Sequence, residues 1–413
     1  MSKDAKNVPA LRFKGYSNAW EKRKLLGLTE KIIDFRGRTP RKLNMHWSDS
    51  GYLALSALNV KMGYIDQNAD AHFGNEILYQ KWMGNSELQT GDVILTTEAP
   101  LGNVFLVGAE TKFILSQRTI ALRTNKSQLN PQFLAVLLSS PIMQTNLRKL
   151  STGGTALGIS QKNLKFLVIN LPTNILEQQA IGSTLMELDS LIAATQDKID
   201  ALEQAKKALL QRLFDQSWRF KDYSDPWEKR KLGELAKVRT GKAFKSSSFS
   251  PNGKYYVVTN KDIGGPQIST HMDGDRIDIT NPVDIAKYSL SGRNLLVTMD
   301  GVNIGKTAMY SNEDAVLAQR VGRLTSSSLD FVHQITSQKN FLTRMNELSV
   351  GNAIKHISLK QISDYAVNVP QQTSERQLIG QTLSLLDNLI AATQSRLSSL
   401  ELLKKSLLQD LFI

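Results

Sequence analysis

The sequence predicts an α+β protein with a pseudo-twofold internal repeat: two similar mixed α/β domains separated by two long helices that form an antiparallel coiled coil. Three observations predict this. The block Leu-Asp-x-Leu-Ile-Ala-Ala-Thr-Gln occurs at residues 188–196 and again at 386–394. Each copy lies in a long heptad pattern of apolar residues. A similar opening segment precedes each of two variable interiors.

Composition limits the class of protein. The 413 residues suffice for two or three domains with their own cores. A formal net charge of +13 favours a polyanionic partner, with DNA or RNA ahead of an acidic membrane surface, although a solvated basic surface also accounts for it. The absence of cysteine excludes disulfides, thiolate zinc sites and a Cys nucleophile, and it fits a reducing cytoplasm. No apolar run approaches the roughly 20 residues of a membrane helix, and the N-terminus is not a secretory signal.

The repeat sets the predicted domain boundaries. Trp20–Leu25 and Trp227–Leu232 open the two copies with an offset of 227 − 20 = 207, whereas Leu188 and Leu386 differ by 386 − 188 = 198. The second copy is therefore nine residues shorter in its interior. We expect a tail at 1–18, a first domain at 19–172, a first helix at 173–216, a second domain at 217–370 and a second helix at 371–413.

Short β-like runs fill both interiors, broken by Gly, Asn and Asp. They are Tyr52–Leu55, Asp92–Thr96, Val104–Val107 and Thr119–Leu122 in the first, and Tyr255–Thr259, Leu295–Thr298 and Arg320–Leu324 in the second. A helix is expected at Gln132–Ser139 and another near Phe331–Ser337. Gln117-Arg118 recurs as Gln319-Arg320, and a Gly-containing turn before Ile-Ser recurs at 153–160 and 351–358.

Each interior ends in a strand closed by proline, at Pro172 and Pro370, and a helix start follows. Asn174 with Glu177, and Ser374 with Gln377, have the spacing of a capping box. The heptad positions are apolar with equivalent polar interruptions at Thr195 and Thr393 and at Lys206 and Lys404. The apolar and Thr core positions are Leu185, Leu188, Ile192, Thr195, Ile199, Leu202, Leu209, Leu213, Leu383, Leu386, Ile390, Thr393, Leu397, Leu400, Leu407 and Leu411.

Two interpretations of the heptads are open. Each helix could pack only on its own domain, but a pattern this long and twice repeated favours pairing of one helix with the other. A helix of about 40 residues is about 60 Å long. That exceeds one turn of B-DNA, about 34 Å. Such a rod could hold two DNA-reading domains over nearly successive major grooves.

Catalytic motifs are incomplete. Gly301–Thr307 resembles a phosphate loop, but the first Gly would have to stand at Asp300, so a turn before a strand is favoured. Asn130–Phe133 lacks the second Pro of an amino-methyltransferase motif. The histidines, at 46, 72, 271, 333 and 356, show no metal-ligand spacing, and no nucleophile elbow is present.

The layout resembles the DNA-specificity subunit of type I restriction–modification systems, over almost the whole chain from Trp20 onward. The resemblance rests on the openings at 20–25 and 227–232, the helix starts Glu177–Gly182 and Glu375–Gly380, and the blocks at 188–196 and 386–394. These features occur twice in the same order, which makes the match specific.

The resemblance implies that each domain is a target-recognition domain that reads one half of a bipartite, asymmetric site in double-stranded DNA. The helices would be spacers that set the gap between half-sites and dock two modification (methyltransferase) subunits. Those subunits would use S-adenosylmethionine to methylate adenine at N6, and restriction (motor-nuclease) subunits would use ATP and Mg²⁺. This chain would be non-catalytic and would bind no cofactor, metal or membrane.

Candidate DNA contacts are cations for phosphates and Arg, Lys, Asn or Gln for base edges. The densest group lies in a Gly/Pro loop at 36–42, expected to be irregular, for which we favour contact over a solvated charge. Elsewhere both interpretations stay open. The candidates are Arg36, Arg38, Arg41, Lys42, Arg118, Lys242, Lys245, Asn260, Lys261, Arg320 and Lys355.

Two other function classes are open alternatives. The chain could be a methyltransferase or nuclease acting alone, which the incomplete motifs disfavour. It could also be a coiled-coil adaptor with non-specific nucleic-acid binding, which a requirement for two half-sites at fixed spacing would exclude.

Overall fold

The computed structural model describes residues 7–109, 112–153, 157–263, 274–351 and 355–412. The chain divides into two compact units, Met1–Lys198 with Gln394–Ile413, and Ile199–Thr393. His271 and the centres of the two recurring turns, residues 154–155 and 352–353, lie outside the described residues. Within the described part of the chain, no helix is long and apolar enough to cross a membrane.

The first unit is built on a four-stranded antiparallel sheet in the order β2-β8-β5-β6. Its strands are β2 (Thr29–Asp34), β8 (Thr119–Thr124), β5 (Val93–Thr97) and β6 (Leu101–Leu106). A smaller sheet holds β4 (Phe73–Gly74), β3 (Tyr52–Leu55) and β7 (Ile114–Leu115), with α1 (Glu76–Met83) packed beside it. The η2 (Leu25–Leu28) and η3 (Pro40–Leu43) turns join the early strands.

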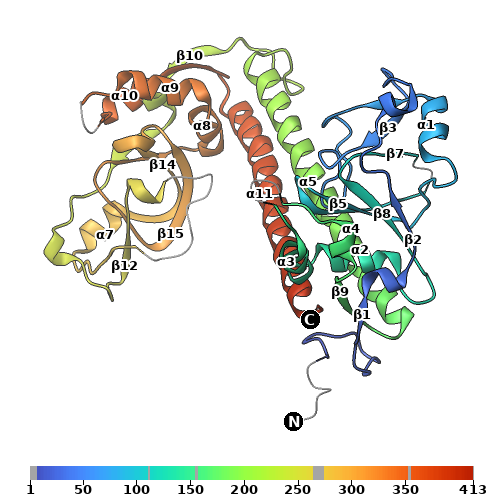
Figure 1. Ribbon diagram of the computed structural model, residues 1–413. Helices are drawn as coiled ribbons and strands as arrows, with labels where there is room; N and C mark the ends of the chain where they lie inside the picture. Colours follow the sequence, from blue (N-terminus) through green and yellow to red (C-terminus); the bar gives the residue numbers. More distant parts are fainter. Residues whose placement is uncertain (1–6, 110–111, 154–156, 264–273, 352–354, 413) are drawn as a thin grey trace. The chain divides into compact units, whose positions relative to one another are not determined.

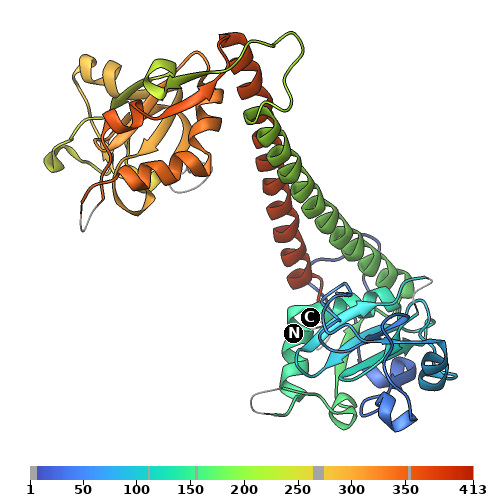
Figure 2. The ribbon, with the colours of Figure 1, turned by 90° about the horizontal axis from the view of Figure 1, so that it is seen from above.

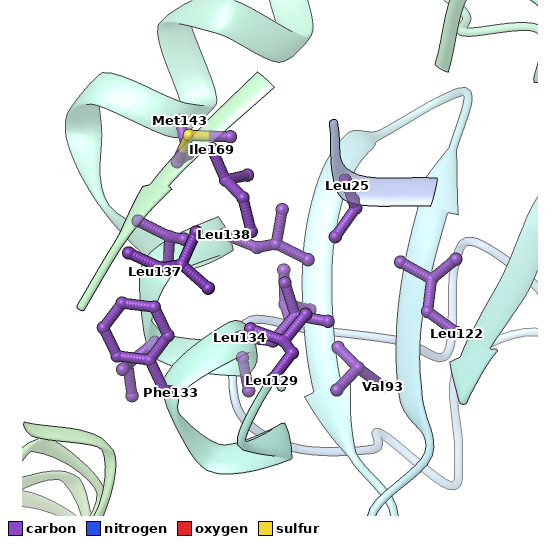
Figure 3. Close-up of a cluster of buried hydrophobic side chains, with 14 of the residues drawn as sticks. Leu25, Val93, Leu122, Leu129, Phe133, Leu134, Leu137, Leu138, Met143 and Ile169 are labelled. Atoms are coloured by element: carbon purple, nitrogen blue, oxygen red, sulfur yellow. The ribbon is translucent and has the colours of Figure 1, made fainter. Parts of the chain in front are cut away.

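Helices cover one face of this sheet and close the main core. They are α2 (Pro131–Ser139), α3 (Pro141–Leu150) and α4 (Gln161–Leu164). Asn130 and Ser140 cap the first two, each followed by Pro at the first helical position, so the chain turns sharply from one helix into the next. Figure 3 shows Leu134 and Leu138 on the side of α2 toward Val93 of β5 and Leu122 of β8, with Phe133 farther from these strands.

The second unit contains a six-stranded sheet in the order β11-β16-β14-β15-β12-β13. Only the β12–β15 pair is parallel among the described strands of this sheet. The strands are β11 (Lys237–Thr240), β16 (Val321–Thr325), β14 (Ser289–Thr298), β15 (Thr307–Leu317), β12 (Tyr255–Val258) and β13 (Arg276–Ile277). The helices are α6 (Leu232–Leu235), α7 (Pro282–Tyr288), α8 (Leu329–Thr336), α9 (Lys339–Leu348) and α10 (Leu359–Ser363), with short turns η4 (Ser246–Ser248), η5 (Asn260–Asp262) and η6 (Gly301–Asn303).

Each unit also has a two-stranded ribbon that ties the opening of the repeat to its end. β1 (Glu21–Lys24) pairs antiparallel with β9 (Val168–Leu171), and β10 (Glu228–Lys231) pairs with β17 (Ala366–Val369). Glu21 faces Leu171 as Glu228 faces Val369. The predicted strands before each proline are therefore present, and they receive the opening segment of their own repeat.

Two long helices leave these ribbons. α5 spans Ile175–Phe214, 40 residues, and α11 spans Thr373–Asp410, 38 residues (Figure 1). Both are drawn without a break in Figure 2. Every predicted core position of the two heptad patterns is buried or partly buried, although Leu411 lies just beyond the end of α11. The period of the sequence thus identified the correct face of both helices.

The end of each long helix belongs to the core of the opposite repeat. In the first unit, Phe412 packs against Trp20 and Phe133, with ring centroids 6.3 and 5.8 Å apart. In the second unit, Phe214 packs against Trp227 and Phe331, both at 5.8 Å. Phe412 is 412 − 133 = 279 positions from Phe133, and Phe214 is 331 − 214 = 117 positions from Phe331, so each core joins distant parts of the chain.

The predicted capping boxes at the helix starts are wrong. Asn174 does cap α5, since its Oδ1 accepts from Leu176 N at 2.9 Å. Glu177, however, turns away from the cap and accepts two hydrogen bonds from Arg12, at 2.7 and 2.8 Å. The second helix begins at Thr373, so Ser374 lies inside it rather than at its cap. A buried ion pair with a distant arginine replaces the local bond that the spacing suggested.

Candidate nucleic-acid interface

An acidic and a basic side chain meet at the end of the central sheet of the second domain. Asp300 follows β14 and Arg320 precedes β16, and Arg320 Nη1 lies 3.1 Å from Asp300 Oδ2. Met299 N donates to the Arg320 carbonyl at 3.1 Å, which fixes the two segments side by side. The side chain of Asp300 is 7% exposed and that of Arg320 is 59% exposed. The carboxylate is therefore held inside the fold while the guanidinium faces solvent.

His356 approaches the same carboxylate from a third segment. Its Nδ1 makes a short contact with Asp300 Oδ1. Ile357 N donates to the Met299 carbonyl at 2.9 Å and holds this segment against the end of β14. Asp300 thus has a partner on each oxygen, and one of its partners is the exposed arginine.

Asn260 and Lys355, both predicted contacts, lie beside this group. Asn260 Nδ2 is 3.5 Å from the Asp300 carbonyl, the limit of a hydrogen bond, and Gly301 N donates to the Lys355 carbonyl at 3.1 Å. Lys261 follows Asn260 in η5 and is exposed. Three predicted residues from separate segments, Arg320, Asn260 and Lys355, therefore lie next to Asp300 and Gly301.

Hydrogen bonds to Asp262 stabilise the η5 turn that carries Asn260. Asp262 accepts hydrogen bonds from Thr259 N at 2.7 Å and Thr259 Oγ1 at 2.9 Å. The Tyr256 hydroxyl also donates to Asp262. Burial, together with this carboxylate, raises the pKa of Tyr256, which keeps the hydroxyl protonated as a donor.

The two predicted lysines that follow β11 make different contacts. The Lys242 carbonyl accepts from Gln319 N at 2.9 Å, so Lys242 adjoins the Arg320 segment, and its Nζ bonds to Asp284 at 2.6 Å. Lys245 is exposed, and its carbonyl accepts from Ser248 N at 2.9 Å in the next turn. Lys242 is joined to the group around Arg320, whereas Lys245 belongs to the adjacent loop.

The first domain repeats the arrangement with other residues. Glu98 follows β5 and Arg118 precedes β8, with Arg118 Nε 3.9 Å from Glu98 Oε2. Thr97 N donates to the Arg118 carbonyl, and Ile159 N to the Thr97 carbonyl, both at 2.8 Å. Gly158 stands opposite Glu98 in an isolated bridge, as His356 stands opposite Asp300. The same three segments meet, but the carboxylate is less enclosed, at 43% exposure.

Arg36, from the predicted basic cluster, reaches the same three-segment junction. Its guanidinium bonds to both Asp34 oxygens at 2.6–3.0 Å, and its Nη1 donates to the Ile159 carbonyl at 3.1 Å. Gln161 adds a bond to Asp34 at 2.6 Å. Burial acts to raise the pKa of Asp34, but the hydrogen bonds and charge of Arg36 outweigh it, so the pKa is lowered. Arg36 is therefore partly committed to the fold.

The other cations of the cluster divide in the same way. Arg38 donates to the Trp82 carbonyl and stacks over the Phe35 ring at 4.3 Å. Arg41 and Lys42 are exposed. The exposed pair is better placed for a phosphate than Arg36 or Arg38.

The prediction that this loop has no regular element is wrong. Pro40–Leu43 forms a 3-10 turn, capped by Thr39, whose Oγ1 accepts from Lys42 N at 3.3 Å. Proline has the backbone angle that the first position of such a turn needs, so it starts the turn instead of preventing it. Lys42 Nζ closes the turn on the Gly37 carbonyl at 2.6 Å.

The residues that the sequence analysis missed are acidic. Glu98 and Asp300 were passed over because cations were sought, yet they share the offset of the arginines, 300 − 98 = 202 and 320 − 118 = 202. That equality was the available signal. Among the described residues, no group of His, Cys, Asp or Glu could hold a metal ion.

The sequence matches the family described as "Type I restriction modification DNA specificity domain" twice, at residues 18–204 and 224–402. The chain belongs to this family. The predicted resemblance is thereby confirmed, and each of the two matches covers one recognition domain and most of the long helix after it.

Two relatives of this specificity protein come from Methanocaldococcus jannaschii. The type I restriction enzyme MjaVIII specificity subunit is 24% identical over 74% of each chain. The putative type I restriction enzyme MjaX specificity subunit is 22% identical over 94% of this chain and 92% of its own. The crystal structure of the type I restriction–modification S subunit from M. genitalium aligns with a TM-score of 0.67 at 18% identity, covering 98% of this chain and 99% of that one. This likeness supports the mixed α/β fold with two domains of one family.

Proposed function

We propose that this specificity protein is the non-catalytic, sequence-reading subunit of a type I restriction–modification complex. The domain at 19–172 reads one half of a bipartite, asymmetric site in double-stranded DNA, and the domain at 217–370 reads the other. One observation carries the proposal: the same solvent-facing arginine, beside a carboxylate, occurs at equivalent positions of both domains. Two similar reading surfaces with different surroundings suit two different half-sites.

We also propose that α5 and α11 pair as an antiparallel coiled coil about a pseudo-twofold axis. Lys404 bonds to Asp189 within the first unit, and Lys206 bonds to Asp387 within the second. The residue numbers of both pairs sum to the same value, 404 + 189 = 593 and 206 + 387 = 593. A constant sum is what two antiparallel helices in one register produce. The polar heptad positions Lys206 and Lys404 then fix that register.

The helices serve as the spacer between half-sites and as the dock for two modification subunits. Apolar side chains on their outer faces support docking, since burial in a complex would remove them from water. They are Leu176 and Leu191 on α5 and Leu385, Leu389, Leu402 and Leu403 on α11, exposed by 39–69%. S-adenosylmethionine binds to the modification subunits, ATP and Mg²⁺ act in the restriction subunits, and the complex works on DNA in the cytoplasm.

Methylome sequencing of cells that carry this chain with its partner subunits tests the proposal. A methylated adenine in each half of one gapped sequence is the expected result. Gel shifts of the purified chain over rising salt add a second criterion. Binding without sequence preference would favour an adaptor, and methyl transfer by the chain alone would favour an enzyme; either outcome rejects the proposal.

A matched insertion tests the spacer. One heptad added after Gln196 and one after Gln394 lengthen both helices by about 10.5 Å and keep the pairing register. The gap should grow by about three base pairs, at roughly 3.4 Å each, with both half-sites unchanged. Exchange of residues 19–172 with those of a related protein should alter one half-site only. A changed half-site after the insertion would refute the spacer role.

A further inference from the structure

Two arginines of this chain have an unusual backbone conformation at equivalent positions. Arg118 has φ = 62° and Arg320 has φ = 68°. L-residues with a side chain rarely adopt this region, because Cβ crowds the carbonyl oxygen, and glycine is the residue that avoids the conflict. Strained residues of this kind cluster at functional sites, where the side chain has a task that offsets the strain.

Packing does not require these side chains. Both arginines are exposed, by 52% at Arg118 and 59% at Arg320, while their carbonyls bond to Thr97 N and Met299 N. Glycine would form the same backbone hydrogen bonds with less strain. The chain nevertheless has, at both positions, a long cationic side chain with five N–H donors. We infer a task for the guanidinium itself.

The carboxylates beside them indicate what the guanidinium binds. A phosphate that approached Arg320 would also approach the charge of Asp300, and the two anions would repel each other. A base edge is neutral and meets no such repulsion. The ion pair between Arg320 Nη1 and Asp300 at 3.1 Å orients the planar group and leaves other N–H donors toward solvent. This arrangement suits a neutral surface with two adjacent acceptors.

Guanine presents that surface in the major groove, through N7 and O6. We propose that Arg118 and Arg320 are the equivalent base-reading residues of the two domains, each binding the N7/O6 edge of a guanine in its own half-site. Glu98 and Asp300 are positioning residues that orient them. The inference rests on the proposed function and assigns which residues read bases.

The two sites differ in how firmly the arginine is held. Asp300 is clamped between Arg320 and His356, whereas Glu98 is half exposed, 3.9 Å from Arg118, and faces Gly158, which has no side chain to offer. Loss of the carboxylate should therefore disturb the second domain more. Asp300→Asn should weaken discrimination at one base pair more than Glu98→Gln does at its own.

Neighbouring residues supply the other contact type around Arg320. Lys242 adjoins the Arg320 segment through the bond from Gln319 N, while Asn260 and Lys355 adjoin Asp300 and Gly301. Phosphate contacts position a protein on the duplex, whereas base contacts give specificity. A base-reading arginine with the exposed Lys355 nearby suits such a division.

The experiment uses the full chain with its modification subunits. The wild-type half-sites are first read by methylome sequencing. Binding is then measured by competition against duplexes in which each base pair of each half-site is replaced in turn. Arg320→Lys keeps the charge but removes the planar fork, so it should lower discrimination about 10- to 100-fold at a single G·C pair of one half-site. Arg118→Lys should do the same in the other half-site.

Arg293→Lys is the matched control. Arg293 is 62% exposed and pairs with Asp330, which is 13% exposed, but it lies in the middle of β14 and has no positive φ. Its replacement should leave every base preference unchanged. Arg320→Gly adds a test of folding, because glycine suits the backbone there. A melting temperature at or above that of the wild type, with the base preference lost, is expected.

Several outcomes would overturn the inference. A uniform loss of affinity on all sequences, with the salt slope reduced by about one, would make Arg320 a phosphate contact. A changed preference at an A·T pair, an unchanged profile, or a lower melting temperature in Arg320→Gly would also reject it. In these cases the wild type still reads two half-sites. Absence of any gapped site for the wild type would instead reject the proposed function.

Discussion

Gly182→Ala tests how the first recognition domain is seated on its long helix. In an open helix this change stabilises by about 1 kcal/mol, because alanine loses less backbone entropy than glycine. A Cβ on Gly182 would lie only 2.6 Å from Phe133 N and 2.8 Å from Gln132 C, at the first turn of α2. These are backbone atoms, so they cannot rotate away as a flexible side chain could. Overpacking of this kind costs about 1–3 kcal/mol.

We therefore expect Gly182→Ala to lower the stability of the first unit by up to about 2 kcal/mol after the helix gain of about 1 kcal/mol is subtracted. Gly380→Ala should do the same in the second unit, with a larger effect because the contact to Phe331 N is 2.3 Å. Gly27→Ala is the control, since nothing lies within 4 Å of its added Cβ.

Hydrogen exchange followed by mass spectrometry assigns the loss to a region. It does not need the two-state assumption, which multidomain chains often violate. Amides of α2 should exchange faster in Gly182→Ala, and amides of α8 should do so in Gly380→Ala. Slower exchange at α2, with a gain of about 1 kcal/mol, would refute this packing because the helix would then behave as open.

Three further predictions concern charges. The coupling energy between Lys206 and Asp387, measured by a double-mutant cycle in urea unfolding, should be about 0.5–1 kcal/mol because both side chains are partly exposed. A value near zero would show that this ion pair does not fix the register of the two helices. Arg12→Ala should lower the free energy of unfolding by about 3–5 kcal/mol, because Glu177 is only 1% exposed and would be left unpaired. The double variant Arg12→Met and Glu177→Leu should recover most of this stability, because it leaves no buried charge. No recovery would refute that reason. Burial lowers the pKa of His333, so below about pH 6.5 the unfolded chain takes up a proton more readily than the folded chain does. The free energy of unfolding should therefore decrease as the pH is lowered below about 6.5. A His333→Gln variant with the same dependence of stability on pH would contradict this.

The helices were predictable in detail because a period needs only the sequence. Every expected heptad position is buried or partly buried, and all but Leu411 lie within α5 or α11. Strands were located to within a few residues at most ends, for example Tyr52–Leu55 at its full extent. The membership of each core was not predictable in this way. Phe412 packs against Trp20 only because a helix from the other repeat ends there, and no local pattern records that.

The sequence indicated the basic residues of the candidate site but not the acidic ones. The cations could be chosen from the sequence because a DNA partner is negatively charged. Their orientation, however, depends on Glu98 and Asp300, which are negatively charged themselves and so were not candidates for DNA contact. The positive φ of Arg118 and Arg320 also could not be predicted from the sequence, because glycine is the residue that usually indicates a positive φ. Arg36 shows the converse error, because a cation chosen for DNA bonds Asp34 and Ile159 of its own domain.

The offsets between the two repeats locate where the domains vary. The offset is 207 at the opening (227 − 20), 202 at the site (300 − 98 and 320 − 118) and 198 at the helices (387 − 189). Phe133 and Phe331 already have the final offset, 331 − 133 = 198, so four of the nine missing residues fall between the reading arginine and the helix that seats on α5 or α11. A length change there alters the approach to the arginine without moving Gly182 or Gly380 from its contact. The reading surface can therefore diverge between the repeats while the helix pairing stays the same.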